Sequence, residues 1–170
     1  MEKLPSSIGN LSCLLTLRID FTEVVTLPNV FWKLKRLRHL YLPRRIEKTT
    51  KRLQFADLTE LRMLVNFPAY CADIKDLTTL TNLRRLEIVA YDNDSLHSLR
   101  MMFMSPIIAF GNLRDLSFST FVGSLDPHIV RNMRDDIISS CPRLLLLKSY
   151  KNVVYQKTAD IFSQEEDQLP

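Results

Sequence analysis

The sequence predicts an α/β solenoid of about six stacked coils, with a parallel β-sheet on the concave face and loops or short helices on the convex face. Two observations predict this fold. Apolar residues recur at fixed spacing in six consecutive segments, and each segment ends in an alternation of apolar and polar residues that is typical of a half-buried strand. The segments begin at Ile8, Phe31, Phe55, Leu77, Ile107 and Ile138, so successive copies are 23, 24, 22, 30 and 31 residues apart.

Spacings of this size indicate a leucine-rich-repeat solenoid, in which each coil buries its apolar residues against the next. Residues 1–150 are therefore assigned to the repeat domain, which begins in mid-repeat with a truncated N-terminal edge. Residues 151–170 are assigned to a terminal edge segment and an acidic tail. The repeated apolar positions are Ile8, Leu11, Leu14, Leu17 and Ile19; Phe31, Leu34, Leu37, Leu40 and Leu42; Phe55, Leu58, Leu61 and Leu64; Leu77, Leu80, Leu83, Leu86 and Ile88; Ile107, Phe110, Leu113, Leu116 and Phe118; and Ile138, Cys141, Leu144 and Leu147.

Each predicted strand leaves two side chains pointing outward from the concave face, since successive strand residues face opposite sides. These pairs are Thr16 and Arg18, His39 and Tyr41, Met63 and Val65, Arg85 and Glu87, Asp115 and Ser117, and Leu146 and Lys148. The concave face of a solenoid is an extended binding surface. The candidate protein-binding residues are Arg18, His39, Tyr41, Met63, Arg85, Glu87 and Lys148.

The two longest spacings predict helices on the convex face. Asp126-Pro127 supplies an N-cap residue followed by proline at the first helical position, and Pro142 lies beyond the end of this segment. A second helix is expected from Ser95, closed by Pro106. The apolar faces of the two segments consist of Ile129, Val130, Met133 and Ile137, and of Leu96, Leu99, Met102 and Phe103. The shorter copies have room only for a loop or a single tight helical turn.

A basic segment runs from Lys33 to Arg52, whereas the rest of the chain is net acidic because the total charge is only +4. Two interpretations are open: a solvated rim, or a surface that docks an acidic protein domain. Nucleic acid is disfavoured, since Trp32 and Tyr41 are almost the only interleaved aromatic residues and no reading motif is present. The candidate docking residues are Lys35, Arg36, Arg38, Arg44, Arg45, Lys51 and Arg52.

No catalytic residue, metal site or cofactor is predicted, and the chain is not expected to be an enzyme. With only 3 glycines the sequence has no glycine-rich phosphate loop, and Cys13, Cys71 and Cys141 form no Cys-x-x-Cys pair. Cys141 occupies an apolar repeat position and is interpreted as a small buried hydrophobic residue. No apolar run approaches the roughly 18 residues of a membrane span, and no secretory signal follows Met1.

Three phrases resemble the repeat region of plant nucleotide-binding leucine-rich-repeat disease-resistance receptors, and the coiled-coil type is most similar. They are Leu4-Pro5-Ser6-Ser7-Ile8-Gly9-Asn10-Leu11, Leu37-Arg38-His39-Leu40-Tyr41-Leu42-Pro43 and Leu80-Thr81-Asn82-Leu83-Arg84-Arg85-Leu86-Glu87-Ile88. The resemblance implies a cytoplasmic role in defence, in which the repeats recognise a pathogen effector or a guarded host protein. It also implies that early basic repeats contact the receptor's nucleotide-binding module and hold it inactive.

Two other classes stay open at this point. Ser139-Ser140-Cys141-Pro142-Arg143-Leu144 has some similarity to the repeats of F-box substrate receptors of ubiquitin ligases. An extracellular receptor ectodomain is the third hypothesis, although such plant repeats keep a more regular period and more glycine. The identity of the ligand, the oligomeric state and the extent of the parent protein do not follow from these residues.

Overall fold

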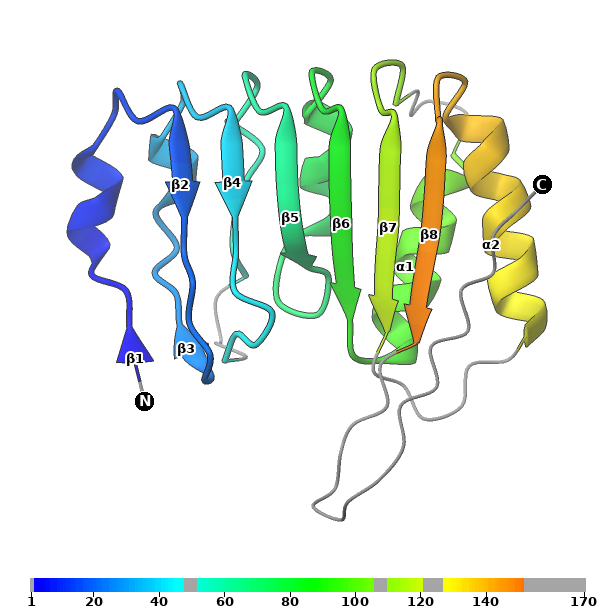
Figure 1. Cartoon of the computed structure of the whole chain (residues 1–170), viewed down its shortest axis with the longest axis horizontal. Coiled ribbons are helices and arrows are strands. Elements are labelled where there is room, and N and C mark those ends of the chain that lie inside the picture. The colour runs from blue at the N-terminus through cyan, green and yellow to red at the C-terminus, as the bar shows by residue number, and fades with distance from the viewer. Residues whose placement is uncertain (1, 48–51, 106–109, 121–126, 152–170) are drawn as a thin grey trace, which may run out of the picture.

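The computed structural model describes residues 2–47, 52–105, 110–120 and 127–151, and its main element is one parallel sheet of six strands (Figure 1). The strands are β2 (Thr16–Arg18), β4 (His39–Tyr41), β5 (Met63–Pro68), β6 (Arg85–Ala90), β7 (Asp115–Thr120) and β8 (Leu146–Lys151). They lie side by side in chain order. The predicted leucine-rich-repeat solenoid is therefore confirmed, with one strand from each of the six copies.

One leucine column shows how the repeats stack. Leu17, Leu40, Leu64, Leu86, Leu116 and Leu147 are successive register partners across the six strands. Leu40, Leu64 and Leu86 have 0% exposure, Leu116 has 1%, and Leu17 at the first strand has 8%. Because identical side chains repeat at one position per coil, stacking buries them in a single continuous core.

Short helical turns connect the strands on the convex side in the early coils. These are the 3-10 turns η1 (Ser6–Asn10), η2 (Phe31–Lys33) and η3 (Ile74–Thr79). Asp73 caps η3 by accepting a hydrogen bond from the backbone N–H of Lys75 at 3.1 Å. The expectation of loops or single tight turns in the short copies is confirmed.

The two predicted helices are present; in Figure 1 α1 lies behind the later strands and α2 lies beside β8 at the end of the sheet. Helix α1 (Asn93–Phe103) begins two residues before Ser95, because the side chain of Asp92 accepts from the Ser95 N–H at 2.7 Å and acts as the N-cap. Helix α2 (Pro127–Ser140) begins with proline, as predicted. The predicted buried residues Leu96, Leu99, Met102, Phe103, Met133 and Ile137 are all buried. Asp126, Pro106 and Ile107, and the side chains of Ile129 and Val130, lie outside the described part of the chain.

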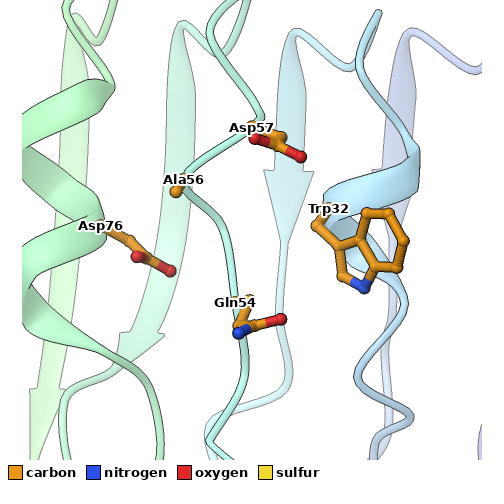
Figure 2. Close-up of a pocket in the computed structure, with 5 residues that line it drawn as sticks. All are labelled: Trp32, Gln54, Ala56, Asp57 and Asp76. Carbon is orange, nitrogen blue, oxygen red and sulfur yellow. The ribbon is translucent and has the colours of Figure 1, made fainter.

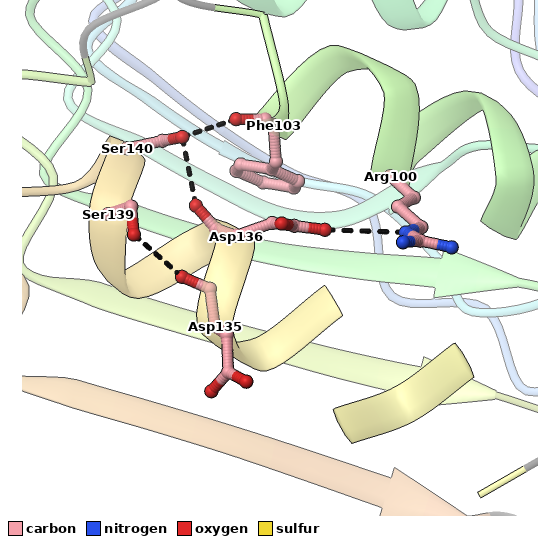
Figure 3. A network of polar contacts seen from close by, with 6 residues as sticks. All are labelled: Arg100, Phe103, Asp135, Asp136, Ser139 and Ser140. Carbon is pink, nitrogen blue, oxygen red and sulfur yellow. Dashed lines mark hydrogen bonds and ion pairs between the residues drawn. The ribbon is translucent and has the colours of Figure 1, made fainter. Parts of the chain in front are cut away.

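Polar contacts join the two helices (Figure 3). The Arg100 guanidinium forms an ion pair with Asp136, with 3.3 Å between Nε and Oδ2. The Ser140 hydroxyl lies within hydrogen-bonding distance of the backbone carbonyls of Phe103 in α1 and of Asp136 in its own helix, and the first of these contacts links the two helices. Neighbouring coils are therefore held together on the convex side as well as through the sheet.

Two predicted core positions are wrong. Ile138 is 52% exposed, since α2 turns Ile137 inward beside Met133 and leaves its neighbour on the solvent side. Leu11 is 53% exposed, whereas its counterpart Leu34 in the next copy is 0% exposed. The first coil has a described neighbour on only one side, so its apolar residues are covered on one side only.

A second, smaller ladder was not predicted. Strands β1 (Glu2–Lys3) and β3 (Val25–Thr26) form a two-stranded parallel sheet, and an isolated bridge continues it from Val25 to Ile46. In β5 the register shifts between Leu64 and Phe67, where Asn66 adopts a positive φ of 61°. The amide of Asn66 donates to the carbonyl of Leu42 at 2.8 Å and so bonds this bulge to the preceding coil.

Candidate protein-binding face

The concave sheet face carries two rows of outward side chains, one residue of each row per strand. The first row is Thr16, His39, Met63, Arg85, Asp115 and Leu146, in continuous register. The second is Arg18, Tyr41 and Val65, then Glu87, Ser117 and Lys148 beyond the bulge in β5. All seven predicted binding residues, Arg18, His39, Tyr41, Met63, Arg85, Glu87 and Lys148, therefore share this face, while their role in binding stays a prediction.

Three of the five charged residues in these rows, Arg18, Arg85 and Glu87, form ion pairs. Arg18 contacts Asp20 at 2.7 Å, and its guanidinium lies 5.2 Å from the centre of the Tyr41 ring. Arg85 contacts Glu87 at 2.5 Å, and this hydrogen bond raises the pKa of Arg85. The hydroxyl of Thr16 lies 3.1 Å from Nδ1 of His39. The face therefore offers mixed polar, aromatic and apolar side chains, which suits a protein partner.

The structure does not gather the predicted basic docking residues into one patch. Lys35, Arg36 and Arg38 precede β4, whereas Arg44 and Arg45 follow it, so the two groups lie at opposite ends of that strand. Arg52 is exposed in the next coil, and Lys51 lies outside the described residues. Proximity in sequence predicted a single surface, but the passage of the chain along β4 divides it.

A further row was missed, and we call it the arginine column: Arg38, Arg62, Arg84 and Arg114. Each follows a buried leucine and stands directly before the outward residue of the first row. Its backbone positions are set by a repeated contact in which each carbonyl accepts two N–H groups from the next coil. The Arg62 carbonyl, for example, accepts from Arg84 at 2.8 Å and from Arg85 at 3.1 Å. The signal was visible as a Leu-Arg pair at the same register in four consecutive copies.

The convex side has an open depression of about 300 Å³. Figure 2 shows the side chains that line it, from Trp32 on η2 across Gln54, Ala56 and Asp57 to Asp76 on η3. Asp76 accepts from the backbone N–H of Phe55 at 2.7 Å, and burial raises the pKa of this carboxyl. The Trp32 ring donates to the carbonyl of Asn29 at 3.2 Å. The carboxylate of Asp76 and the indole N–H are thus both engaged in hydrogen bonds within the protein. The bond from Asp76 to Phe55 connects two neighbouring coils, so we interpret the depression as a packing contact between coils.

Within the described ranges, few other side chains could bind a metal ion or act as a nucleophile. They include no group of three or more His, Cys, Asp or Glu side chains that could hold a metal ion. Among the described residues the three cysteines form no disulfide; Cys13 is exposed, and Cys71 and Cys141 are buried. No helix in these ranges has the length and apolar character to cross a membrane.

The fold and this face define a leucine-rich-repeat protein. A family model described as a leucine-rich repeat region matches residues 1–154, and the chain belongs to this family. It is 40% identical over 101 residues to a probable disease resistance protein, RXW24L, of Arabidopsis thaliana, and 31% identical over 140 residues to the disease resistance protein RPP8 of the same plant. These alignments cover 58% and 81% of the chain but only 11% and 14% of the relatives. The predicted resemblance to plant disease-resistance repeats is confirmed.

Proposed function

We propose that this chain is the protein-recognition module of an intracellular plant immune receptor of the nucleotide-binding type. It senses a pathogen effector or a guarded host protein through the concave sheet face, and it contributes to autoinhibition of the receptor's nucleotide-binding module. The observation that carries the proposal is the pair of side-chain rows on a rigid parallel sheet, in a chain whose named relatives are disease resistance proteins. Because these rows vary without disturbing the leucine core beneath them, the same scaffold can present different surfaces.

The proposed setting is the cytoplasm, where the thiols of Cys13, Cys71 and Cys141 stay reduced. We propose that the chain binds proteins and does not catalyse a reaction, and that the repeat region itself binds no cofactor. The names of the relatives favour this hypothesis over the F-box alternative.

The autoinhibitory contact is tested with the nucleotide-binding module of the parent receptor expressed separately and captured by the 170-residue chain. Since β4 separates the basic residues into two groups, each group is reversed alone: Arg36→Glu with Arg38→Glu, and Arg44→Glu with Arg45→Glu. If one of the two double variants loses capture of the module at both low and moderate salt, the end of β4 that carries its arginines is the docking end. Unchanged capture by both variants would refute the docking proposal.

Effector recognition is tested in the full receptor by a plant-cell death assay. Exchanging the half-buried Glu87→Lys and the exposed Lys148→Glu, which lie on the same row, should abolish the response to the matching effector while the protein accumulates normally. The charge-reversing exchange Lys75→Glu and Asp135→Lys on the convex side is the matched control and should preserve the response. Equal responses from all three proteins would contradict the assignment of recognition to this face.

A further inference from the structure

The convex depression combines an aromatic ring with carboxylates from neighbouring coils. Trp32 of the second coil forms one side, Asp76 of the fourth coil forms the other, and the segment that carries Gln54 and Asp57 lies between them (Figure 2). The volume of about 300 Å³ is at the lower end of the range for ligand pockets. A depression of this size suits one side chain of a partner better than a whole cofactor.

The packing contact between coils holds these walls in place. Asp76 accepts from the backbone N–H of Phe55 at 2.7 Å, and the backbone N–H of Gln54 donates to the side-chain oxygen of Asn29 at 2.9 Å. The ring N–H of Trp32 donates to the carbonyl of Asn29, which fixes the orientation of the indole. Binding to a surface that is already ordered loses little conformational entropy of the protein.

The carboxylate of Asp57 has no cationic partner among the described residues. Its side chain is exposed, and the three ion pairs of the described ranges do not include it. In Figure 2 this carboxylate points from the central segment toward the side of Trp32. Burial raises the pKa of Asp76, and the charges of Asp73 and Asp57 raise it further. The acidic groups therefore repel one another, and a cation between them would relieve that repulsion.

Trp32 supplies a second feature that favours a cation. Its side chain is 37% exposed, and the Nζ atom of Lys33 lies 5.5 Å from the ring centre. Lys33 reaches the ring from the side of the first coil, since a Cβ added at Gly9 would lie 3.2 Å from the Cδ of Lys33. The depression lies toward the third and fourth coils instead. The face of an indole ring attracts cations, and arginine most often.

The two features together select a guanidinium. This group is planar, stacks on aromatic rings and forms two parallel hydrogen bonds with one carboxylate, whereas the lysine ammonium is a strongly hydrated point charge. We propose that the convex depression binds an arginine side chain of a partner protein, with the guanidinium stacked on Trp32 and hydrogen-bonded to Asp57. The site lies on the opposite side of the solenoid from the two concave rows. The proposal therefore goes beyond the proposed function and does not depend on it.

Other ligand classes fit the depression less well. The described residues include no group of three or more His, Cys, Asp or Glu side chains that could hold a metal ion. The phosphates of a nucleic acid would be repelled by Asp57 and Asp76. A free amino acid would make few contacts in an open depression, but an arginine carried by a protein segment also brings the contacts of its neighbours.

The fluorescence of Trp32 reports binding directly, because this residue is the single tryptophan and lies in the proposed site. The 170-residue chain is titrated with the peptide acetyl-Ala-Ala-Arg-Ala-Ala-amide, and with the same peptide carrying citrulline, the neutral isostere of arginine. The arginine peptide should change the emission saturably with a Kd of about 1 mM or below. It should bind at least about ten times more tightly than the citrulline peptide, because only the guanidinium is charged.

Two substitutions test the two proposed contacts. Asp57→Asn should weaken binding of the arginine peptide at least about fivefold, since a neutral amide cannot form the charge-assisted pair. Trp32→Leu, followed by the amide chemical shifts of residues 54–57, should weaken binding at least about threefold. The matched control is Asp135→Asn, which makes the same charge change at an exposed position of α2 and should alter affinity less than about twofold. Circular dichroism of each variant checks that the fold is kept.

Several results would overturn the proposal. Equal affinity of the arginine and citrulline peptides would show that charge is not recognised, and equal affinity of a lysine peptide would contradict the stacked guanidinium. No saturation up to about 10 mM arginine peptide would show that the site does not bind this side chain. Equal losses in Asp57→Asn and Asp135→Asn, or chemical-shift changes confined to the concave strands, would assign the binding to another surface.

Discussion

Replacing Leu64 by alanine is expected to lower the free energy of unfolding by about 3–5 kcal/mol, in the upper part of the range for a buried leucine. Leu64 has 0% exposure, and so do Leu40 and Leu86, its register partners on the two sides. All three belong to strands that are held by backbone hydrogen bonds. The neighbours therefore cannot move to fill the space left by the missing side chain, and the cavity term adds to the lost burial.

The same substitution at two positions of the first coil supplies graded controls. Leu17 occupies the equivalent position with 8% exposure and has a described register partner on one side only, so Leu17→Ala should cost about 2 kcal/mol. Leu11 is 53% exposed, so Leu11→Ala should change stability by less than about 0.5 kcal/mol.

Urea unfolding followed by circular dichroism measures these differences, and the fluorescence of Trp32, the single tryptophan, reports separately on the second coil. Coincident transitions from the two probes validate the two-state treatment, which repeat proteins do not always obey. Equal losses at Leu17 and Leu64 would refute the reasoning, since burial between two coils would then contribute nothing beyond burial against one.

Three further predictions concern charge, thiols and alkaline pH. Combining Arg62→Gln with Arg84→Gln should raise the free energy of unfolding by about 0.2–1 kcal/mol, because two like charges that face each other are removed. The gain in urea midpoint should shrink at high salt. A loss of stability would contradict repulsion within the arginine column. Iodoacetamide at pH 8 should label Cys13 in the native protein and spare Cys141, because burial raises the pKa of the Cys141 thiol to about 11; mass spectrometry reads the sites, and equal labelling would contradict the packing. Burial also raises the pKa of Tyr70 above its ordinary value of about 10, so its contribution to stability is complete below pH 10 and is lost as the pH rises further. Tyr70→Phe should flatten the fall in melting temperature above pH 10, and an unchanged slope would refute this assignment.

Periodicity predicted the core with few errors, and the two errors have identifiable physical causes. The repeat pattern assigns the same burial to every copy, but burial depends on what lies beside a coil and on how its convex segment folds. Leu11 has a described coil on one side only, and Ile138 belongs to a helix whose period differs from that of the repeat.

Candidate binding residues were harder to predict than the core. The period-2 pattern predicted the two rows on the concave sheet face, since alternation alone decides which side chains point outward. The basic segment was grouped by proximity in sequence, but β4 sends Arg38 and Arg44 to opposite ends of a strand. The arginine column was overlooked because its members are 22 to 30 residues apart and become neighbours only when the coils stack.

By itself the sequence determined the repeat, the strand positions, the presence of the two helices and the leucine core, because each of these depends on local periodicity. The tertiary structure alone decided which charges are paired, which are separated and which stand in line. Those relations depend on distances between coils, and such distances exist only after backbone hydrogen bonds have set one strand against the next at a fixed register.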